Sequence, residues 1–165
     1  MYPLPPSVTT ELEDVYTWGK MHTIISDATF EKTDFLRDLT RLELARLMVA
    51  YEKNIAGNTI AQDSACDITA YSDYADIPTD MRQVVRDACS LGIMGWQNDK
   101  QHLLPAFRPN KIVTRAQLSA VLARYIYGDT FIGDMSTEWY VPYLTALHND
   151  GIMNRIDQPD MVERR

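Results

Sequence analysis

The chain has no long apolar run, few glycines and only two cysteines among its 165 residues. No stretch approaches the length of apolar sequence that spans a bilayer. No low-complexity tract appears, and an apolar fraction of 45% with a charged fraction of 24% is typical of an ordinary globular protein. A chain of this length can bury a core without metal or cofactor, as one domain or as a few small repeats.

Positive charge is also scarce, since the formal net charge is −7. No stripe of lysine and arginine alternates with aromatic residues, which argues against a nucleic-acid partner. An acidic molecule can still bind an anionic polymer through a few arginines focused in a groove. The N-terminus lacks the basic start and apolar run of a secretory signal. We expect the proline-rich residues 1–10 to be a linker in a longer protein that carries any export signal elsewhere.

Motifs of known catalytic chemistry are absent. The sequence contains no HExxH helix, no GxSxG elbow and no glycine-rich phosphate loop. The three histidines are isolated in the sequence: His22, His102 and His148. The aspartates around Asp73 lack the spacing and central glycine of an EF-hand loop. We therefore expect a protein that is not an enzyme and that uses no metal or cofactor.

The two cysteines, Cys66 and Cys89, lie on either side of a turn-rich segment. A disulfide that closes a loop of this size would contribute about 3 kcal/mol by the loop-entropy estimate. Two buried thiols in a cytoplasmic protein are the alternative. Spacing alone leaves both interpretations open.

An internal repeat is the strongest pattern in the chain. Residues 40–51 (TRLELARLMVAY) align without a gap to residues 114–125 (TRAQLSAVLARY). Each begins with a threonine followed three residues later by Glu or Gln, the arrangement of a capping box. Apolar residues then recur at i, i+3, i+4 and i+7, as on a helix packed on one face. The pattern predicts two matching helices that begin at Thr40 and Thr114.

Two further helical stripes, residues 81–91 and 140–147, are followed by Gly92 and Gly151. A glycine there can take the left-handed conformation that closes a helix, and the next residue, Ile93 or Ile152, can fold back on it. A less regular stripe covers residues 12–19. The organisation predicts an all-α fold of three helix–loop–helix units, at residues 11–55, 66–127 and 131–165, with the second helix of the third unit missing.

This organisation resembles the S-layer homology (SLH) family, and the second unit matches the family pattern best. It carries four family elements in order: Tyr71-Ser72-Asp73, Leu91-Gly92-Ile93, Phe107-Arg108-Pro109 and Val113-Thr114-Arg115-Ala116-Gln117. The first unit departs from the pattern with Thr23 in place of the family's glycine. The third unit stops where its capped helix should begin.

The resemblance implies three units around a pseudo-threefold axis and grooves between units that bind anionic, often pyruvylated, cell-wall polysaccharide. It places the protein outside the cell, at the cell surface or in an S-layer, without a membrane span. Pairing of Cys66 with Cys89 suits that setting. The alternative is an assembly module that joins neighbouring surface-protein subunits and binds no glycan.

Arg41 and Arg115 are the leading ligand-binding candidates, because each takes the first position of a capped helix. A guanidinium beside free helix amides would attract a carboxylate or pyruvyl group. The alternative is that each arginine pairs with an acid of a neighbouring unit. Four more candidates complete the expected site, namely Gly92, Gly151, Trp139 and Asp73. Helix closure, packing and turn capping are their alternative roles.

Overall fold

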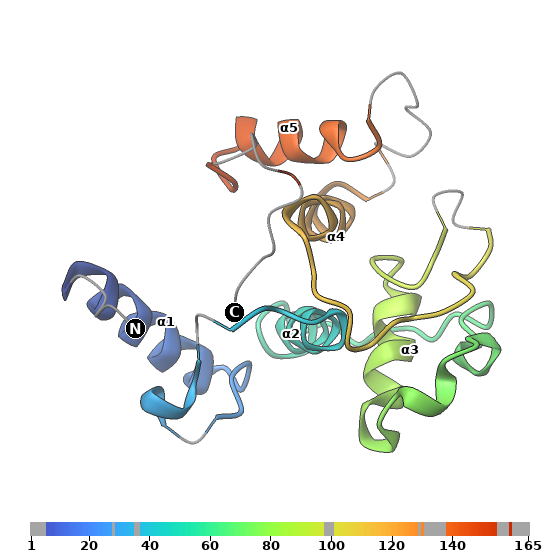
Figure 1. Ribbon diagram of the computed structural model, residues 1–165, viewed down its shortest axis with the longest axis horizontal. Helices are drawn as coiled ribbons and strands as arrows, with labels where there is room; N and C mark the ends of the chain where they lie inside the picture. Colours follow the sequence, from blue (N-terminus) through green and yellow to red (C-terminus); the bar gives the residue numbers. More distant parts are fainter. Residues whose placement is uncertain are drawn as a thin grey trace.

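The computed structural model describes residues 6–27, 29–34, 37–97, 101–128, 130, 138–154 and 159. These residues form five α-helices and no strand, as the all-α prediction requires (Figure 1). The α-helices are α1 (Pro6–Met21), α2 (Arg41–Asn54), α3 (Arg82–Ser90), α4 (Arg115–Tyr127) and α5 (Val141–Asn149). Four short 3₁₀ turns are η1 (Phe30–Lys32), η2 (Ile68–Ala70), η3 (Tyr74–Asp76) and η4 (Thr79–Met81).

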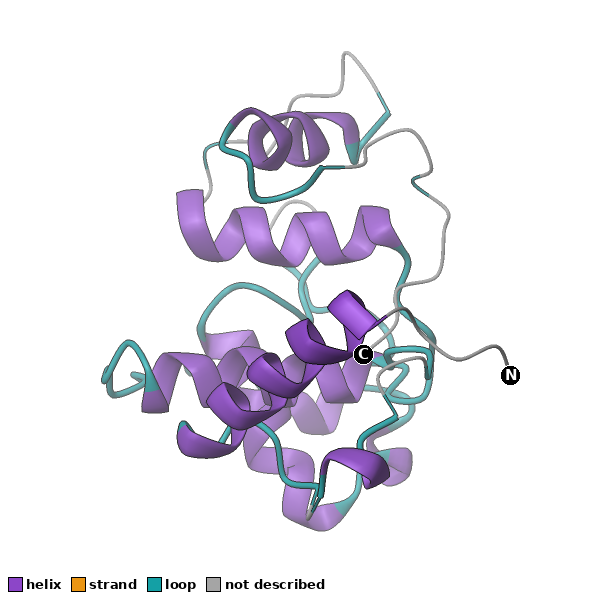
Figure 2. Ribbon diagram, turned by 90° about the vertical axis from the view of Figure 1, so that its left-hand side faces the viewer, coloured by secondary structure: helices purple, strands orange, loops and turns teal. Residues whose placement is uncertain are grey.

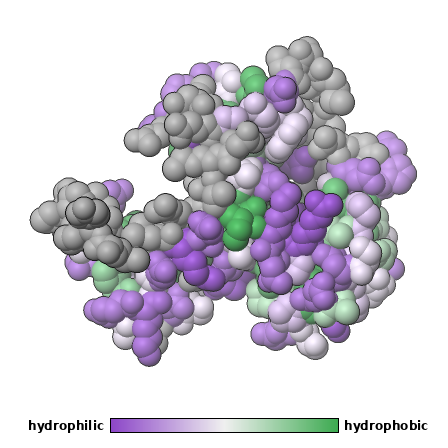
Figure 3. All heavy atoms as spheres, viewed as in Figure 1, coloured by the Kyte–Doolittle hydropathy of each residue, from purple (hydrophilic) through white to green (hydrophobic). Residues whose placement is uncertain are grey.

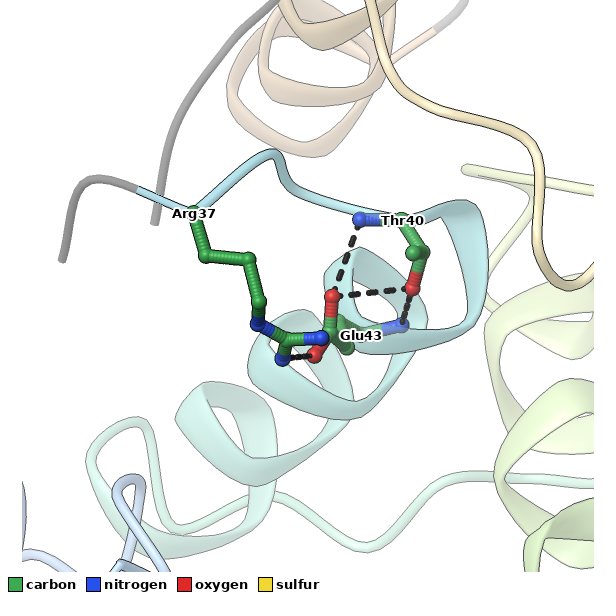
Figure 4. A network of polar contacts seen from close by, with 3 residues as sticks. All are labelled: Arg37, Thr40 and Glu43. Carbon is green, nitrogen blue, oxygen red and sulfur yellow. Dashed lines mark hydrogen bonds and ion pairs between the residues drawn. The ribbon is translucent and has the colours of Figure 1, made fainter. Parts of the chain in front are cut away.

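The two capped helices begin as predicted, one residue after Thr40 and after Thr114, and both starts are complete capping boxes. At α2 the Glu43 amide donates to the Thr40 hydroxyl at 3.3 Å, and the Thr40 amide donates to the Glu43 carboxylate at 3.0 Å. Figure 4 shows this network, in which Arg37 adds an ion pair to Glu43. Gln117 makes the same pair of bonds with Thr114 at the start of α4.

The start of α2 is joined to the segment that precedes α4. The amide of Arg41 donates to the carbonyl of Lys111 at 2.9 Å, and that of Leu42 donates to the carbonyl of Pro109 at 3.0 Å. Val113 N–H returns a bond to the Leu39 carbonyl at 2.8 Å. The bonds of Arg41 and Leu42 satisfy helix donors that have no partner inside the helix.

Helices α1, α3 and α5 end in the same way. Thr23, Gly92 and Gly151 take positive φ values of 59°, 70° and 71°. A main-chain amide beyond each then donates back into the last helical turn: Ile24 to Gly19 at 2.8 Å, Met94 to Ala88 at 3.3 Å and Ile152 to Leu147 at 2.8 Å. The predicted closure by the two glycines is confirmed. Helix α1 ends in the same way at Thr23, a β-branched residue for which a positive φ is strained.

Packing follows the apolar stripes of the helices. α2 packs against α3, and α4 packs against α5 (Figures 1 and 2). The main core gathers α2, α3 and the chain before α4, with Phe107, Val85 and Val113 fully buried. A second cluster between α4 and α5 contains Ala120, Ala123, Tyr143 and Leu147.

Cys66 and Cys89 form a disulfide with a Cα–Cα distance of 5.8 Å. Both are buried and pack with Trp96, whose indole Nε1 donates to the Cys89 carbonyl at 2.8 Å. The bridge thus ties the chain before η2 to the end of α3 and supports Trp96.

Helix α1 begins at Pro6, within the residues 1–10 that were expected to be a linker. Proline suits the first helical turn, where no partner for its missing N–H is needed. Pro142 also lies in the first turn of its helix, as expected. The end of the proposed third unit, residues 160–165, falls outside the described residues. The arrangement of the units around a pseudo-threefold axis stays a prediction.

Replacing Thr23 by glycine should stabilise the protein by about 1 kcal/mol, because glycine takes a positive φ without steric cost. Gly151→Ala is the matched control and should destabilise by about the same amount, since open space around its Cβ leaves only the backbone strain. Urea denaturation of the three proteins measures both changes. Equal loss of stability in both variants would show that Thr23 is not strained.

Candidate ligand-binding groove

Arg41 extends from the first turn of α2 and is held by the chain before α4. Its Nε donates to the Phe107 carbonyl at 2.8 Å, and its guanidinium lies 5.3 Å from the centroid of the Phe107 ring. Within the described part of the chain, its two Nη nitrogens make no hydrogen bond. The Nε edge of the guanidinium therefore orients the side chain, and the Nη nitrogens are left for a ligand.

One cavity of about 240 Å³ opens beside Arg41. α4 contributes Gln117, Ala120, Val121 and Arg124, and the chain after α3 contributes Met94, Gly95 and Trp96. Trp139, which precedes α5 and is 41% exposed, lines the same cavity. Two cations and two indoles thus face one space.

A second cavity of about 210 Å³ adjoins the first. Its charged lining residues are Arg41, Arg108 and Lys111. The two cavities share Arg41, Leu104 and Gln117 and are therefore neighbours, and we call the two together the Arg41 groove. Hydrophilic side chains gather near the point where α2, α3 and α4 come together, on the face shown in Figure 3.

The groove concentrates positive charge in a protein with net charge −7. Burial lowers the pKa of Arg41, the nearby Arg108 and Arg124 lower it further, and Tyr71 and Asp73 act against this shift. Arginine stays charged despite such a shift. A charge that is partly desolvated and surrounded by like charges is stabilised by a bound anion.

Gln117 places a neutral amide where a carboxylate would oppose an anion. Its Oε1 accepts from the Thr114 backbone N–H at 3.2 Å, and Gln117 lines both cavities of the groove. The corresponding residue of α2 is Glu43, which makes the same cap and pairs with Arg37. Glutamine therefore keeps the helix cap while leaving the groove without a negative charge at this point.

Arg124 is held at the other side of the groove by α5. Its guanidinium lies 5.7 Å from the centroid of the Tyr143 ring. Its Nε is buried and has no hydrogen-bond partner among the described residues. Packing on α5 therefore fixes the direction in which this cation reaches the cavity.

Gly95 brings the backbone close to the groove wall. Its φ is +90°, and a Cβ atom there would lie 2.3 Å from the Tyr71 hydroxyl oxygen. The Tyr71 hydroxyl donates to the Gly95 carbonyl at 3.3 Å. Any side chain at residue 95 would therefore displace Tyr71 from beneath the groove.

The structure brings only some of the expected site residues together. Arg41 and Trp139 line the groove, whereas Gly92 and Gly151 close helices and line neither of its cavities. Asp73 accepts from the Phe107 and Arg108 amides at 2.8 and 2.6 Å. It therefore supports the loop that carries Arg108.

Arg115 is 8% exposed and lines neither cavity. The helix amides expected to bind an anion are already bonded: Arg41 and Leu42 donate to carbonyls before α4, and Ala116 donates to the Pro159 carbonyl at 2.9 Å. An anion in the groove would meet side-chain cations rather than these amides.

Four charged or amide-bearing residues of the groove were not expected from the sequence: Arg108, Lys111, Gln117 and Arg124. The internal repeat contained a pattern that could have pointed to some of them. The aligned helices differ in charge at three positions, where α2 has Glu43, Arg46 and Ala50 and α4 has Gln117, Ala120 and Arg124. All three α4 residues line the groove.

Comparison of the chain with protein-family models, with curated proteins and with solved structures finds no match. None of the described helices combines the length and the apolar character needed to cross a bilayer. Among the residues that the structure describes, no three His, Cys, Asp or Glu side chains gather as metal ligands. The groove itself is therefore the basis for a functional proposal.

The stability of the fold should fall as the pH rises from about 10 to about 12. Burial is the main cause that raises the pKa of Tyr71 and of Tyr125 to about 12, and Glu52 contributes at Tyr125. Unfolded tyrosines lose their protons near pH 10, so between these values the folded state binds more protons and alkali favours unfolding. Below pH 10 the contribution is fully present.

Urea denaturation at neutral pH and at about pH 11 tests this dependence. The double variant Tyr71→Phe/Tyr125→Phe should lose less stability over that interval than the wild type. An identical loss in both proteins would assign the alkaline unfolding to other groups.

Proposed function

We propose that this chain is a non-catalytic anchoring module of a bacterial cell surface, which binds an anionic cell-wall polysaccharide in the Arg41 groove. The observation that carries the proposal is the convergence of Arg41 and Arg124 with the indoles of Trp96 and Trp139 on one cavity. Cations fix the acidic group of such a ligand, and an exposed indole offers an apolar face to a sugar ring.

The resemblance to SLH domains supports the same function. Under this proposal the three units surround a pseudo-threefold axis and the Arg41 groove is a seam between them, since its walls come from α2, from the chain after α3 and from α4. The Cys66–Cys89 disulfide is consistent with a protein outside the cytoplasm.

Gln117→Glu should weaken binding to cell walls without unfolding the protein. Glutamate can make the same capping box, as Glu43 does in α2, but it brings a negative charge into the groove. We expect at least about a tenfold loss of affinity, equal to about 1.4 kcal/mol, in co-sedimentation with purified Gram-positive cell walls. Walls stripped of their acidic polysaccharide should bind neither protein.

Asn149→Asp is the control, because it adds the same charge at an exposed position that lines neither cavity of the groove. It should sediment like the wild type. Glycan anchoring through this groove is wrong if the wild type does not sediment with intact walls, or if Gln117→Glu sediments equally well.

An assembly module is the second candidate, and an apolar depression between α1, α2 and α4 favours it. This cavity of about 400 Å³ is lined by Trp18, Leu47, Tyr51 and Ile126 among others. Trp18 and Ile126 are each 46% exposed. Apolar surface of this kind is typical of contact with a partner, here a neighbouring surface-protein subunit.

Light scattering of the purified chain tests self-assembly through this surface. If the second candidate is right, the mass should rise with protein concentration, and Ile126→Lys should keep the protein monomeric because it places a charge in the contact. A wild-type mass that stays monomeric at high concentration contradicts assembly between copies of the chain.

A further inference from the structure

We propose that the Arg41 groove binds two anionic groups of one linear ligand, one on each side of Arg41. This inference rests on the proposed function and specifies its ligand class: a polymer whose sugars carry repeated acidic groups, rather than a single acidic residue at a chain end. The basis is the pair of adjoining cavities that share Arg41, with a separate set of cations in each.

The first subsite is the cavity with Arg41, Arg124 and the two indoles. Arg124 is partly buried and held against Tyr143, and Gln117 adds a neutral polar side chain to the lining. This subsite offers both charge and an apolar wall, so it suits an acidic sugar ring as a whole.

The second subsite contains Arg41, Arg108 and Lys111, and no aromatic side chain among the described residues lines it. Arg108 and Lys111 are exposed, and main-chain hydrogen bonds hold the loop that carries them. Arg108 has a φ of 59°, and its amide donates to the Asp73 carboxylate at 2.6 Å. Asp73 is thus a positioning residue that stabilises an unfavourable backbone conformation and holds the Arg108 side chain beside Arg41.

Neither subsite alone accounts for this distribution of charge. One carboxylate can be bound by Arg41 and Arg124, and it leaves Arg108 and Lys111 in the second cavity, which shares Arg41 with the first. A ligand with two linked anions would occupy both cavities. Once its first anionic group is bound, the second group is held close to its own subsite. The affinity of the linked ligand therefore exceeds that of either group alone.

A length series of oligogalacturonates, which carry one carboxylate on each ring, tests the proposal by calorimetry. We expect the tetramer to bind at least about tenfold more tightly than galacturonic acid. In Arg108→Gln/Lys111→Gln that advantage should disappear, while affinity for the monomer stays within about twofold of the wild type. Lys20→Gln/Lys32→Gln removes the same charge from exposed positions on α1 and η1 and should keep the full length dependence.

Several outcomes would overturn the two-subsite proposal: equal affinity for monomer and tetramer, no binding by any member of the series, or equal loss of monomer and tetramer binding in Arg108→Gln/Lys111→Gln. Co-sedimentation with cell walls is measured on the same proteins. If one of these outcomes is found and the wild type still sediments with cell walls, only the two-subsite proposal is wrong. If the wild type does not sediment with cell walls, the anchoring function is wrong as well.

Discussion

The main-chain pairing between the start of α2 and the chain before α4 is the interaction on which the rest of the structure depends. It satisfies the first amides of α2 with carbonyls from residues 109 and 111. The same pairing brings the Phe107 carbonyl and ring to Arg41, and Arg108 and Lys111 to the groove. Helix capping and the charge of the groove are therefore produced by one contact between segments about seventy residues apart.

Helix positions were largely predictable from the sequence, because their signals are local. Thr40 and Thr114 specify helix starts through bonds that span three residues, and glycine at 92 and 151 specifies helix ends through a backbone preference. Thr23 shows the limit of such rules. The same helix end forms there without glycine, and the amides of Ile24 and Ile25 both donate to the Gly19 carbonyl.

The groove was only partly predictable, because it depends on which segments meet. Arg41 and Trp139, both named from the sequence as ligand-binding candidates, line the groove, whereas the helix amides that were expected to bind the anion are already bonded. Arg124 is indistinguishable from any surface arginine of a helix until α5 is packed against it. Asp73 likewise could not be assigned to the Arg108 loop, whose amides lie more than thirty residues further along the chain.

The difference between the two matched helices explains how one building block serves two purposes. In α2 the positions of Glu43 and Arg46 are used within the fold: Glu43 pairs with Arg37, and Arg46 donates to the Ile24 carbonyl at 3.0 Å. In α4 the equivalent positions hold neutral Gln117 and small Ala120, which leave room and remove negative charge beside Arg124. The capping and core positions are retained in both helices, so the fold is unaffected by these exchanges. Local charge rather than the net charge of −7 therefore determines what the groove can bind.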